Sequence, residues 1–398
     1  MRKSVCRSKF SALSLPIVLA LGSAAFVPPF MSSAAIADPL PKLTLSVQET
    51  TVSGLSSGAF MSVQLQTAFS SNISGAGIVA GGPYGCAVVQ SWWNAFVYYR
   101  ALKAVGVCMD NAPSAPDPAE ALQVMRDNSG KIDPIAGIAD DRIYLFHGDA
   151  DVTVHGPTMD ALRQVYADLN VPAESIRYVD DINAGHGFLT AADAKNTCPA
   201  DPDAANADLT CGVVACSTTA PDYLNSCDAP QGSTEKIEQA RDILNWLYGP
   251  LVPATAPVDA NFKTFDQTLY TNGAAGMGNT GFAYIPTACS EGASCRLHIA
   301  LHGCEQTSGQ IGEKYARLTQ FNRWAESNRI VVLYPQAEVI PGNFFNGYGL
   351  AGGNPKGCWD WWGYSSSDFL TKDAPQIAAI AKMAEALGAP IAETSPLN

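Results

Sequence analysis

The sequence predicts an α/β fold built on a mainly parallel, doubly wound sheet. Short strand-like segments alternate with helix-like segments along most of the chain, which is typical of parallel sheets with helices on both faces. Residues 75–82 form a short apolar run that ends in glycines, as expected of a buried strand. With 398 residues, 47% of them hydrophobic, the chain is long enough for one large domain or two moderate ones.

The expected elements follow one another in that alternating order. We expect strands at residues 45–52, 75–82, 142–147, 175–179, 281–286, 297–301 and 330–334. We expect helices at residues 59–69, 119–127, 158–169, from 233 onward, at 313–327 and at 373–387. Residues 84–109 are rich in aromatic side chains and bracketed by cysteines, which indicates an insertion that packs over the sheet. Residues 249–257 contain several prolines and read as a linker.

The first 37 residues have the features of a secretory signal peptide. A basic start precedes an apolar run at residues 10–27, and Ala35-Ile36-Ala37 matches an Ala-x-Ala cleavage site. Prolines and a polar end make a retained membrane anchor the weaker interpretation. We therefore expect a secreted protein, with the periplasm as the alternative location.

The charge of the chain limits its partners. The formal net charge is −13, and the leader carries only basic charges, so its removal makes the mature chain more acidic still. An acidic surface disfavours nucleic acids and anionic membranes as partners. We expect a soluble monomer that acts on a neutral substrate.

The cysteines favour disulfides over a metal site. One of the 11 cysteines lies in the leader, and an even number remains in what is expected to be an exported chain. The expected pairs are Cys86 with Cys108, Cys289 with Cys295, Cys304 with Cys358, and two pairs among Cys198, Cys211, Cys216 and Cys227. Zinc is the alternative for that last cluster. It lacks a Cys-x-x-Cys pair and a nearby histidine, so we expect no metal.

Ser56 is the candidate nucleophile. Residues 54–58 read Gly-Leu-Ser-Ser-Gly, between an expected strand and an expected helix. Gly-x-Ser-x-Gly in this context is typical of the nucleophile turn of α/β-hydrolases, in which a strained serine projects from the sheet. The backbone N–H of Ser57 would then contribute to an oxyanion hole. An ordinary Gly/Ser turn is the alternative interpretation.

A serine nucleophile needs a base and an acid, and both follow in the chain. His186 lies in a Gly-His-Gly loop past a strand, where it is the candidate base. Asp149 and Asp151 both follow the 142–147 strand, and the pattern His-Gly-x-x-Asp selects Asp151 as the acid, with Asp149 as the alternative. The order Ser56, Asp151, His186 is that of α/β-hydrolases. The reaction would need no cofactor.

The second oxyanion donor is expected far downstream of Ser56. In α/β-hydrolases a His-Gly loop that supplies it precedes the serine. Here the matching segment is Leu301-His302-Gly303-Cys304, and the helix that should precede the serine strand is the last one in the chain. The sequence therefore predicts a circularly permuted α/β-hydrolase fold over residues 38–398, with about residues 249–260 joining the original ends. Cys304 N–H would complete the oxyanion hole, and His302 would be structural. A separate C-terminal domain is the alternative.

These motifs together resemble the extracellular poly(3-hydroxybutyrate) depolymerases of the single-domain, circularly permuted kind. The matching pieces are residues 53–60, His147-Gly-x-x-Asp151, residues 184–188, residues 301–304 and Cys358-Trp-Asp-Trp361. The resemblance implies a serine esterase that acts on this polyester, with Ser56, Asp151 and His186 as catalytic residues. It also implies a tryptophan that holds a monomer unit, for which Trp359 is the best match and Trp361 the second. Core packing is the alternative role for both rings.

The alternative functions all use the same fold: some are other esterase activities, and one is binding without catalysis. A feruloyl or acetylxylan esterase, or a hydrolase of hydroxybutyrate oligomers, would carry the same catalytic motifs. A secreted binding protein without catalytic activity would also keep the fold. The chain has no separate segment that resembles a polymer-binding domain, so polymer would have to adsorb to exposed apolar residues near the active site.

Overall fold

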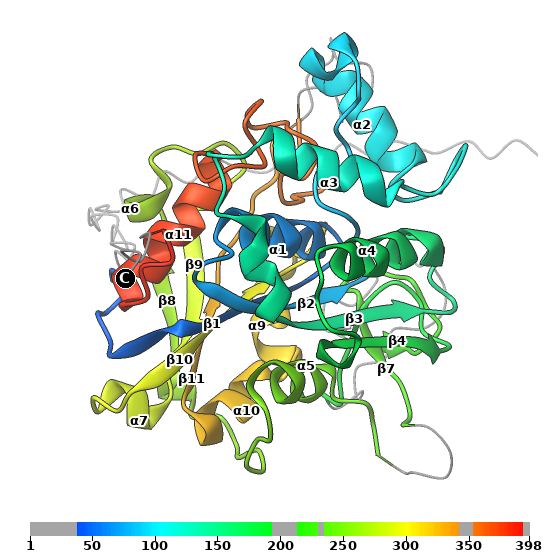
Figure 1. The fold of residues 1–398 in the computed structure, drawn as a ribbon. Helices are drawn as coiled ribbons and strands as arrows, with labels where there is room; N and C mark the ends of the chain where they lie inside the picture. Colours follow the sequence, from blue (N-terminus) through cyan, green and yellow to red (C-terminus); the bar gives the residue numbers. More distant parts are fainter. Residues whose placement is uncertain (1–37, 193–212, 230–234, 342–352, 393–398) are drawn as a thin grey trace, which may run out of the picture. The chain divides into compact units, whose positions relative to one another are not determined.

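A mainly parallel sheet organises the molecule, which confirms the predicted fold class. The computed structural model describes residues 38–192, 213–229, 235–341 and 353–392. In this part of the chain, eight strands run in the order β4-β3-β2-β1-β10-β11-β9-β8 (Figure 1). The strands are β1 Leu45–Leu55, β2 Ile73–Val79, β3 Arg142–Gly148, β4 Ile176–Ile182, β8 Phe262–Asp266, β9 Thr280–Tyr284, β10 Cys295–Leu301 and β11 Ile330–Tyr334. From β4 to β11 every pair is parallel, and β9 and β8 are added antiparallel at one edge.

Helices connect these strands, as the alternation in the sequence predicts. They are α1 Ser57–Ala68, α2 Val97–Gly106, α3 Pro118–Asp127, α4 Gly156–Asp168, α5 Gln239–Tyr248, α6 Thr268–Thr271, α7 Thr287–Ser290, α8 Ser308–Ile311, α9 Lys314–Leu318, α10 Phe321–Asn328 and α11 Pro375–Leu387. Short 3₁₀ turns are η1 Trp92–Ala95, η2 Ile135–Asp140, η3 Ala173–Ser175 and η5 Asp259–Asn261. A small second sheet pairs β5 Phe188–Leu189 and β6 Val214–Ala215 with β7 Leu224–Ser226. Among the described residues, no helix is both long and apolar enough to cross a membrane.

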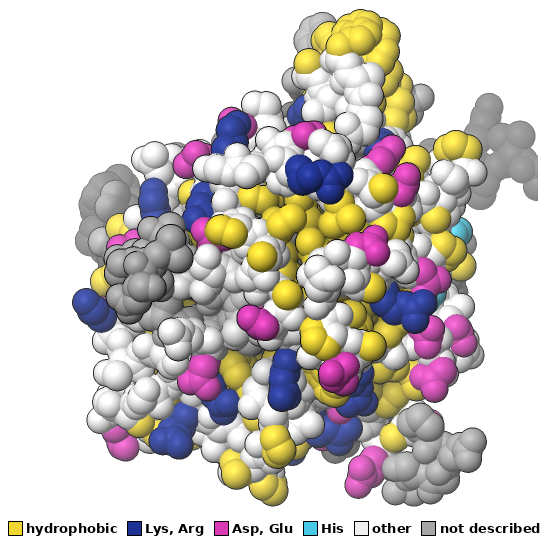
Figure 2. Space-filling model, in the orientation of Figure 1, with side chains coloured by type: hydrophobic (Ala, Val, Ile, Leu, Met, Phe, Trp, Pro, Cys, Tyr) yellow, Lys and Arg dark blue, Asp and Glu magenta, His cyan; other side chains and the backbone are white. Residues whose placement is uncertain are grey.

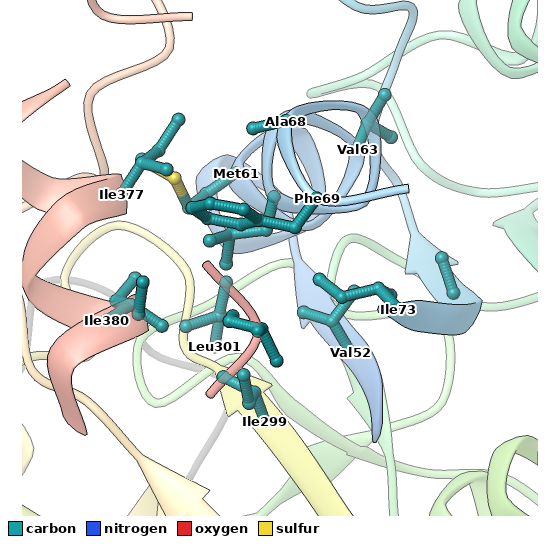
Figure 3. Close-up of a cluster of buried hydrophobic side chains, with 14 of the residues drawn as sticks. Val52, Met61, Val63, Ala68, Phe69, Ile73, Ile299, Leu301, Ile377 and Ile380 are labelled. Carbon is teal, nitrogen blue, oxygen red and sulfur yellow. The ribbon is translucent and has the colours of Figure 1, made fainter. Parts of the chain in front are cut away.

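The inner strands of the central sheet are buried on both faces along most of their length. Successive side chains of a strand point to opposite faces, and in β3 Ile143 and Leu145 join one apolar cluster while Tyr144 and Phe146 join the other. The first cluster lies under α1, α4 and α11, and the second lies under α5, α9 and α10. Figure 3 shows part of the first cluster, with side chains Val52, Met61, Val63, Ala68, Phe69, Ile73, Ile299, Leu301, Ile377 and Ile380 labelled. The chain is therefore doubly wound, with a hydrophobic layer on each side.

Two segments differ from the expected structure. The single helix expected at residues 313–327 is broken into α9 and α10, because Gln320 adopts a left-handed conformation with φ 68°. The aromatic insertion does not pack over the sheet: Trp92 and Phe96 are 67% and 50% exposed. α2 lies beyond α3 on the side away from the sheet (Figure 1). The aromatic side chains of η1 stack mainly on one another. The inner side of the insertion, with Ala101, Ala104 and Cys108, instead packs in a small separate cluster with Phe60, Trp361 and Trp362.

The strand order supports the predicted permutation, which remains a prediction. If the C-terminal half of the chain is counted first, with β8 as strand 1, the order across the sheet becomes 1-2-4-3-5-6-7-8. The end of α11 also lies where β1 begins, because Leu43 N–H donates to Leu387 C=O at 2.9 Å. The last helix of the chain thus occupies the place of the helix that would precede β1 in an unpermuted chain.

The disulfides of the described residues include the predicted pairs. Cys86 is bonded to Cys108, Cys289 to Cys295, and Cys304 to Cys358. Within the four-cysteine cluster the partners are Cys216 and Cys227. Cys198 and Cys211 lie outside the described residues, as does the predicted leader.

A buried carboxyl group beside α1 gives the protein a pH-dependent stability. Asp141 is 4% exposed and accepts a 2.6 Å hydrogen bond from Gln66 Nε2. Gln66 Oε1 in turn accepts from the hydroxyl of Tyr166 at 2.7 Å. Burial raises the pKa of Asp141 from its ordinary 3.8 to about 8. The folded protein therefore holds a proton there at neutral pH that the unfolded chain releases.

We expect Asp141→Asn to remove this pH dependence. The contribution of Asp141 is fully present below pH 3.8 and is lost as the pH rises through about 8, because only the unfolded chain ionises easily. Asparagine keeps an acceptor for Gln66 and cannot ionise. Between pH 5 and pH 9, the free energy of unfolding should fall more steeply in the wild type than in the variant, by about 2–5 kcal/mol. Denaturant unfolding at each pH measures this free energy. If its pH profile is parallel in the wild type and the variant, the raised pKa of Asp141 is contradicted.

Candidate active site

Ser56 lies between the end of β1 and the start of α1, in a strained conformation. Its backbone has φ 55° and ψ −119°, a conformation that residues other than glycine rarely adopt. The N–H of Ser56 donates to Val79 C=O at 2.9 Å, which ties the turn to β2. The side chain lines a cavity at the carboxyl ends of the parallel strands. This is the strand-turn-helix setting that the Gly-x-Ser-x-Gly pattern predicts.

The two glycines of the pattern are required by close backbone approach. A Cβ atom on Gly54 would lie 2.3 Å from the backbone of Gly58. A Cβ atom on Gly58 would lie 2.4 Å from the carbonyl oxygens of Leu301 and His302. Gly58 therefore lets α1 begin directly against the end of β10. The turn that carries Ser56 and the loop that carries Cys304 are in contact for this reason.

Asp151 and His186 form a buried pair. His186 Nδ1 lies 2.8 Å from Asp151 Oδ2, and their side chains are 5% and 1% exposed. The other carboxylate oxygen of Asp151 accepts from the N–H groups of Thr153 and Val154 at 2.8 and 3.1 Å. This leaves His186 Nε2 as the ring nitrogen free of Asp151. Asp149, the alternative acid, is exposed and two residues earlier in the turn.

The surroundings of Asp151 keep it ionised. Burial by itself would raise the pKa of Asp151, but the charge and hydrogen bond of His186 and the two N–H donors hold it below the ordinary value of 3.8. The stability that these contacts contribute is present above the ordinary carboxyl pKa and is lost as the pH falls through the lower, folded-state pKa. The ionised carboxylate of Asp151 can therefore stabilise a positive charge on the neighbouring ring.

Two of the other described histidines, His298 and His302, are buried and have structural partners. His298 is fully buried between β1 and β10, 2.8 Å from both Thr51 Oγ1 and Ser53 Oγ, and burial lowers its pKa to about 3. His302 accepts from Ala337 N–H through Nε2, so its Nδ1 donates to Gly303 C=O at 2.7 Å. Burial lowers the pKa of His302 to about 4, so both rings are neutral at pH 7. Neither residue lines the cavity that contains Ser56.

The loop after β10 brings Cys304 to the same cavity. The Cys304–Cys358 disulfide anchors it, and Gly303 N–H donates to Gln306 Oε1 at 2.6 Å. Glu305 has φ 61° and donates its N–H to Lys356 C=O at 2.6 Å. No acceptor in the described part of the chain takes the Cys304 N–H. That donor is therefore available to a ligand.

The cavity brings together three of the predicted residues, Ser56, His186 and Cys304, around a volume of about 180 Å³. Its lining consists of Leu55, Ser56, Met109, Thr153, His186, Tyr223, Gly303, Cys304, Glu305 and Lys356. No hydrogen bond joins Ser56 Oγ to His186 among the described residues, and such bonds are often long in unliganded sites. Two predicted residues are next to the lining but not part of it: Asp151 contacts His186, and Ser57 follows Ser56 as the first residue of α1.

Trp359 and Trp361 do not line this cavity. Trp359 is fully buried, and its indole N–H donates to His302 C=O at 3.0 Å. Trp361 is 7% exposed and stacks on Phe60 with ring centroids 4.1 Å apart. Both rings are packed in the interior, which was the alternative interpretation. This packing gives no support to the predicted substrate contact.

Sequence reasoning did not identify Tyr223, Glu305 and Lys356 as cavity residues. Tyr223 donates its hydroxyl to Glu305 Oε2 at 2.6 Å, and Lys356 Nζ lies 3.3 Å from the same oxygen. The sequence offers one indication of this position, because Glu305 directly follows Cys304, which is predicted to lie in the site. Within the described ranges, no group of three or more His, Cys, Asp or Glu side chains is placed to hold a metal ion.

The chain is similar to two sequences of depolymerases. It is 32% identical over 377 residues to a polyhydroxybutyrate depolymerase of Talaromyces funiculosus, which covers 93% of this chain and 96% of that relative. It is 37% identical over 366 residues to a poly(3-hydroxybutyrate) depolymerase of Delftia acidovorans, which covers 90% of this chain but 63% of that relative. The chain thus spans less than two thirds of the Delftia protein. A comparison with protein-family models found no match.

Solved structures agree with the sequence comparison. A PHB depolymerase from Penicillium funiculosum aligns with a TM-score of 0.69 at 29% identity, covering 88% of this chain and 98% of that one. A PHB depolymerase complexed with an R3HB trimer aligns equally well over the same shares of both chains. Because the Talaromyces relative is matched over nearly its whole length, this chain belongs to the polyhydroxybutyrate depolymerase family.

Proposed function

We propose that this chain is a secreted serine esterase that hydrolyses ester bonds of poly(3-hydroxybutyrate) to hydroxybutyrate oligomers and monomers. The observation that carries the proposal is the cavity in which Ser56 meets the Asp151–His186 pair, in a chain of the depolymerase family. No cofactor takes part. Ester hydrolysis by this route needs only a nucleophile, a base and an oxyanion site.

Ser56 is the nucleophile and His186 the base. Ser56 Oγ attacks the ester carbonyl carbon while His186 Nε2 takes its proton. The imidazolium is stabilised by Asp151 through the 2.8 Å contact at Nδ1. When the tetrahedral intermediate collapses, the leaving hydroxyl takes that proton. Water then attacks the acyl-enzyme with His186 again as base, which releases the acid and restores Ser56.

The N–H groups of Ser57 and Cys304 form the oxyanion hole. Ser57 is the first residue of α1, where backbone N–H groups have no partner within the helix. The Cys304 N–H is unpaired among the described residues, and the disulfide to Cys358 fixes its loop. One such donor contributes on the order of 3 kcal/mol of transition-state stabilisation.

A short acyl unit suits the cavity better than an aromatic one. Pockets for drug-sized ligands span roughly 300–1,000 Å³, and the volume beside Ser56 is about 180 Å³. A hydroxybutyryl unit is small and unbranched beyond one methyl group, whereas a feruloyl group carries a substituted ring. The size of the cavity therefore favours the polyester over feruloyl esters.

Granule clearing tests this substrate assignment. Purified protein should clear suspended poly(3-hydroxybutyrate) granules, release soluble hydroxybutyrate species and turn over short p-nitrophenyl esters, but not feruloyl esters. Ester turnover without granule clearing would instead favour a carbohydrate esterase or an oligomer hydrolase. Failure to turn over any ester or to react with a fluorophosphonate would indicate a binding protein.

An exposed aromatic segment is suited to hold the polymer surface. This aromatic arm comprises η1 and α2, and its exposed side chains are Trp92, Trp93, Phe96, Tyr98, Leu102 and Val105. Tyr98, Leu102 and Val105 recur at helical spacing, so they share one face of α2. In the orientation of Figure 1, Figure 2 shows apolar side chains gathered over this part of the molecule. An uncharged apolar face of this kind fits a neutral polyester surface.

The aromatic arm is joined directly to the active site. The Cys86–Cys108 disulfide closes its base, and the next residue, Met109, lines the cavity. Arg100 on α2 donates to the carbonyl oxygens of Trp362 and Gly363 at 2.8 Å, which ties the arm to the loop after Cys358. Polymer held by the arm would therefore lie near the entrance to the catalytic cavity.

Polar substitutions on the arm should separate adsorption from chemistry. We expect the combined variant Trp92→Asn, Phe96→Asn, Leu102→Asn to bind granules at least about tenfold more weakly, because it removes apolar contact area. Turnover of a soluble p-nitrophenyl ester should not change. Leu269→Asn with Val252→Asn is the matched control, since both residues are exposed and apolar but lie outside the arm. Equal granule binding by the wild type, the arm variant and the control variant would contradict the role of the arm.

The proposal extends to location and partners. The predicted leader at residues 1–37 and the four disulfides among the described residues both support export into an oxidising compartment. The net charge of −13 disfavours nucleic acid and anionic membranes as partners. We expect a monomer, which light scattering on the purified mature chain measures.

A further inference from the structure

One disulfide-closed segment contacts both halves of the proposed catalytic machinery. Residues 213–229, called the clasp here, contain β6, β7 and the Cys216–Cys227 disulfide. On one side the clasp holds the loop of His186, and on the other it holds the loop that carries Cys304. These two loops come from distant parts of the chain, so the clasp sets the position of one relative to the other.

The contact with the His186 loop is made mainly through the backbone. His186 N–H donates to Thr219 Oγ1 at 2.9 Å, and Gly185 N–H donates to Cys216 C=O at 2.8 Å. Phe188 N–H donates to Tyr223 C=O at 2.8 Å, where β5 pairs with β7. The three consecutive residues Gly185, His186 and Gly187 thus all lie against the clasp.

The clasp lies so close to the loop of His186 that only glycine fits on either side of this histidine. A Cβ atom on Gly185 would lie 2.4 Å from Thr218 C=O, and one on Gly187 would lie 2.2 Å from Asn225 Oδ1. Asn225 Nδ2 donates to Cys216 C=O at 2.9 Å and to Thr218 C=O at 2.8 Å, which braces the clasp internally. The Gly-His-Gly pattern is therefore a requirement for contact with the clasp.

The contact with the Cys304 loop runs through Gln306. This buried side chain accepts from Gly303 N–H at 2.6 Å and donates to Asp222 C=O in the clasp at 2.6 Å. Lys314 Nζ lies 2.7 Å from Asp222 Oδ2, and Tyr223 donates its hydroxyl to Glu305 at 2.6 Å. Gln306 thus links the turn that presents the Cys304 N–H to the clasp.

The clasp is bent between its two contacts. Asp222 and Tyr223 have φ 46° and 47°, a left-handed conformation that persists only where surrounding contacts hold it. Asp222 is held by Gln306 and Lys314, while Tyr223 C=O holds Phe188. The bend therefore joins the two contacts through adjacent residues of the chain.

We propose that the clasp sets the position of His186 relative to the Cys304 N–H, with Thr219 and Gln306 as positioning residues for ester hydrolysis. This rests on the proposed function, because it assigns the base to His186 and an oxyanion donor to Cys304. Proton transfer and oxyanion binding act on the same intermediate, so both groups must be placed correctly at once. A misplacement of about 1 Å can reduce a rate about 100-fold.

Thr219→Val tests the contact at His186. The variant should lower kcat for a soluble short ester about 10- to 100-fold with little change in KM, because ground-state binding does not use this hydrogen bond. Thr219→Ser keeps the hydroxyl and should restore most of the rate. Ser217→Ala is the control in the same segment, since its side chain is exposed and the hydrogen bond to His186 N–H is made by Thr219 instead. Fluorophosphonate titration of Ser56 counts the active molecules in each preparation.

The titration separates positioning from folding. If Thr219→Val lowers the fraction of titratable protein while each active molecule keeps the wild-type rate, the residue is only structural and the proposal is wrong. Unchanged kcat would also overturn it. If the wild type itself hydrolyses no ester or is not labelled at Ser56, the proposed function fails, and that result is distinct from both outcomes.

A double-mutant cycle tests whether the clasp connects the two loops. Gln306→Met removes both hydrogen bonds of the bridge while it keeps a side chain of similar length. Changes at independent sites multiply their effects on rate, whereas changes at coupled sites do not. With Thr219→Val and Gln306→Met combined, we expect a loss of kcat clearly smaller than the product of the single losses. A loss equal to that product would show that each residue acts on its own loop alone.

Discussion

Ser56→Ala should abolish ester hydrolysis. Without the hydroxyl no acyl-enzyme forms, and a loss of at least about 10⁴-fold in kcat is expected for a serine hydrolase. Substrate binding should persist, because the oxyanion donors and the rest of the cavity lining are unchanged. The fold should also persist, since alanine keeps the Cβ atom in the strained turn at φ 55°.

The measurement is kcat for a p-nitrophenyl ester and for granules, together with a thermal unfolding curve for each protein. Ser71→Ala is the control, because this exposed serine follows α1 and lies outside the cavity. A Ser56→Ala protein with more than trace activity would rule out the covalent mechanism.

Asp151→Asn should have the second-largest effect. An asparagine amide at this position would favour the wrong tautomer of His186 and could not stabilise the imidazolium. The expected loss in kcat is about 10⁴-fold with a small change in KM. Asp149→Asn is the matched control, because this exposed carboxylate lies two residues away and was the alternative acid.

The pair of variants decides between the two carboxylates. Steady-state kinetics on a soluble ester at neutral pH is sufficient, since the pKa of Asp151 lies below its ordinary value and the wild-type group is ionised there. Large loss in Asp149→Asn with near-normal activity in Asp151→Asn would contradict the assignment.

Much of the sheet could be predicted because its inner strands are buried on both faces. Ile330–Tyr334 and Arg142–Gly148 are apolar runs bounded by turns, and the sequence marks both clearly. β8 was missed, because an edge strand such as Phe262–Asp266 has polar, exposed positions and no apolar run. The break at Gln320 was also missed, since the left-handed conformation there falls on a glutamine and no glycine marks it in the sequence.

The candidate site was predictable where a motif carries geometry. The Gly-x-Ser-x-Gly turn and the Gly-His-Gly loop signal close backbone approach, and the glycines at 54, 58, 185 and 187 meet backbone or side-chain atoms as such motifs require. Tyr223 reaches the cavity through the fold of the clasp, which no local pattern records. Trp359 and Trp361 were assigned by resemblance alone, and aromatic rings are also common in cores.

Labelling of Ser56 during granule hydrolysis tests the central claim most directly. The protein is treated with a fluorophosphonate in portions, and the adduct is located by peptide mass spectrometry. We predict one adduct, on Ser56, and a rate of hydroxybutyrate release from granules that falls in proportion to the labelled fraction. Soluble hydroxybutyrate oligomers should slow the labelling. An adduct on another residue, or undiminished granule hydrolysis by fully labelled protein, would contradict the account.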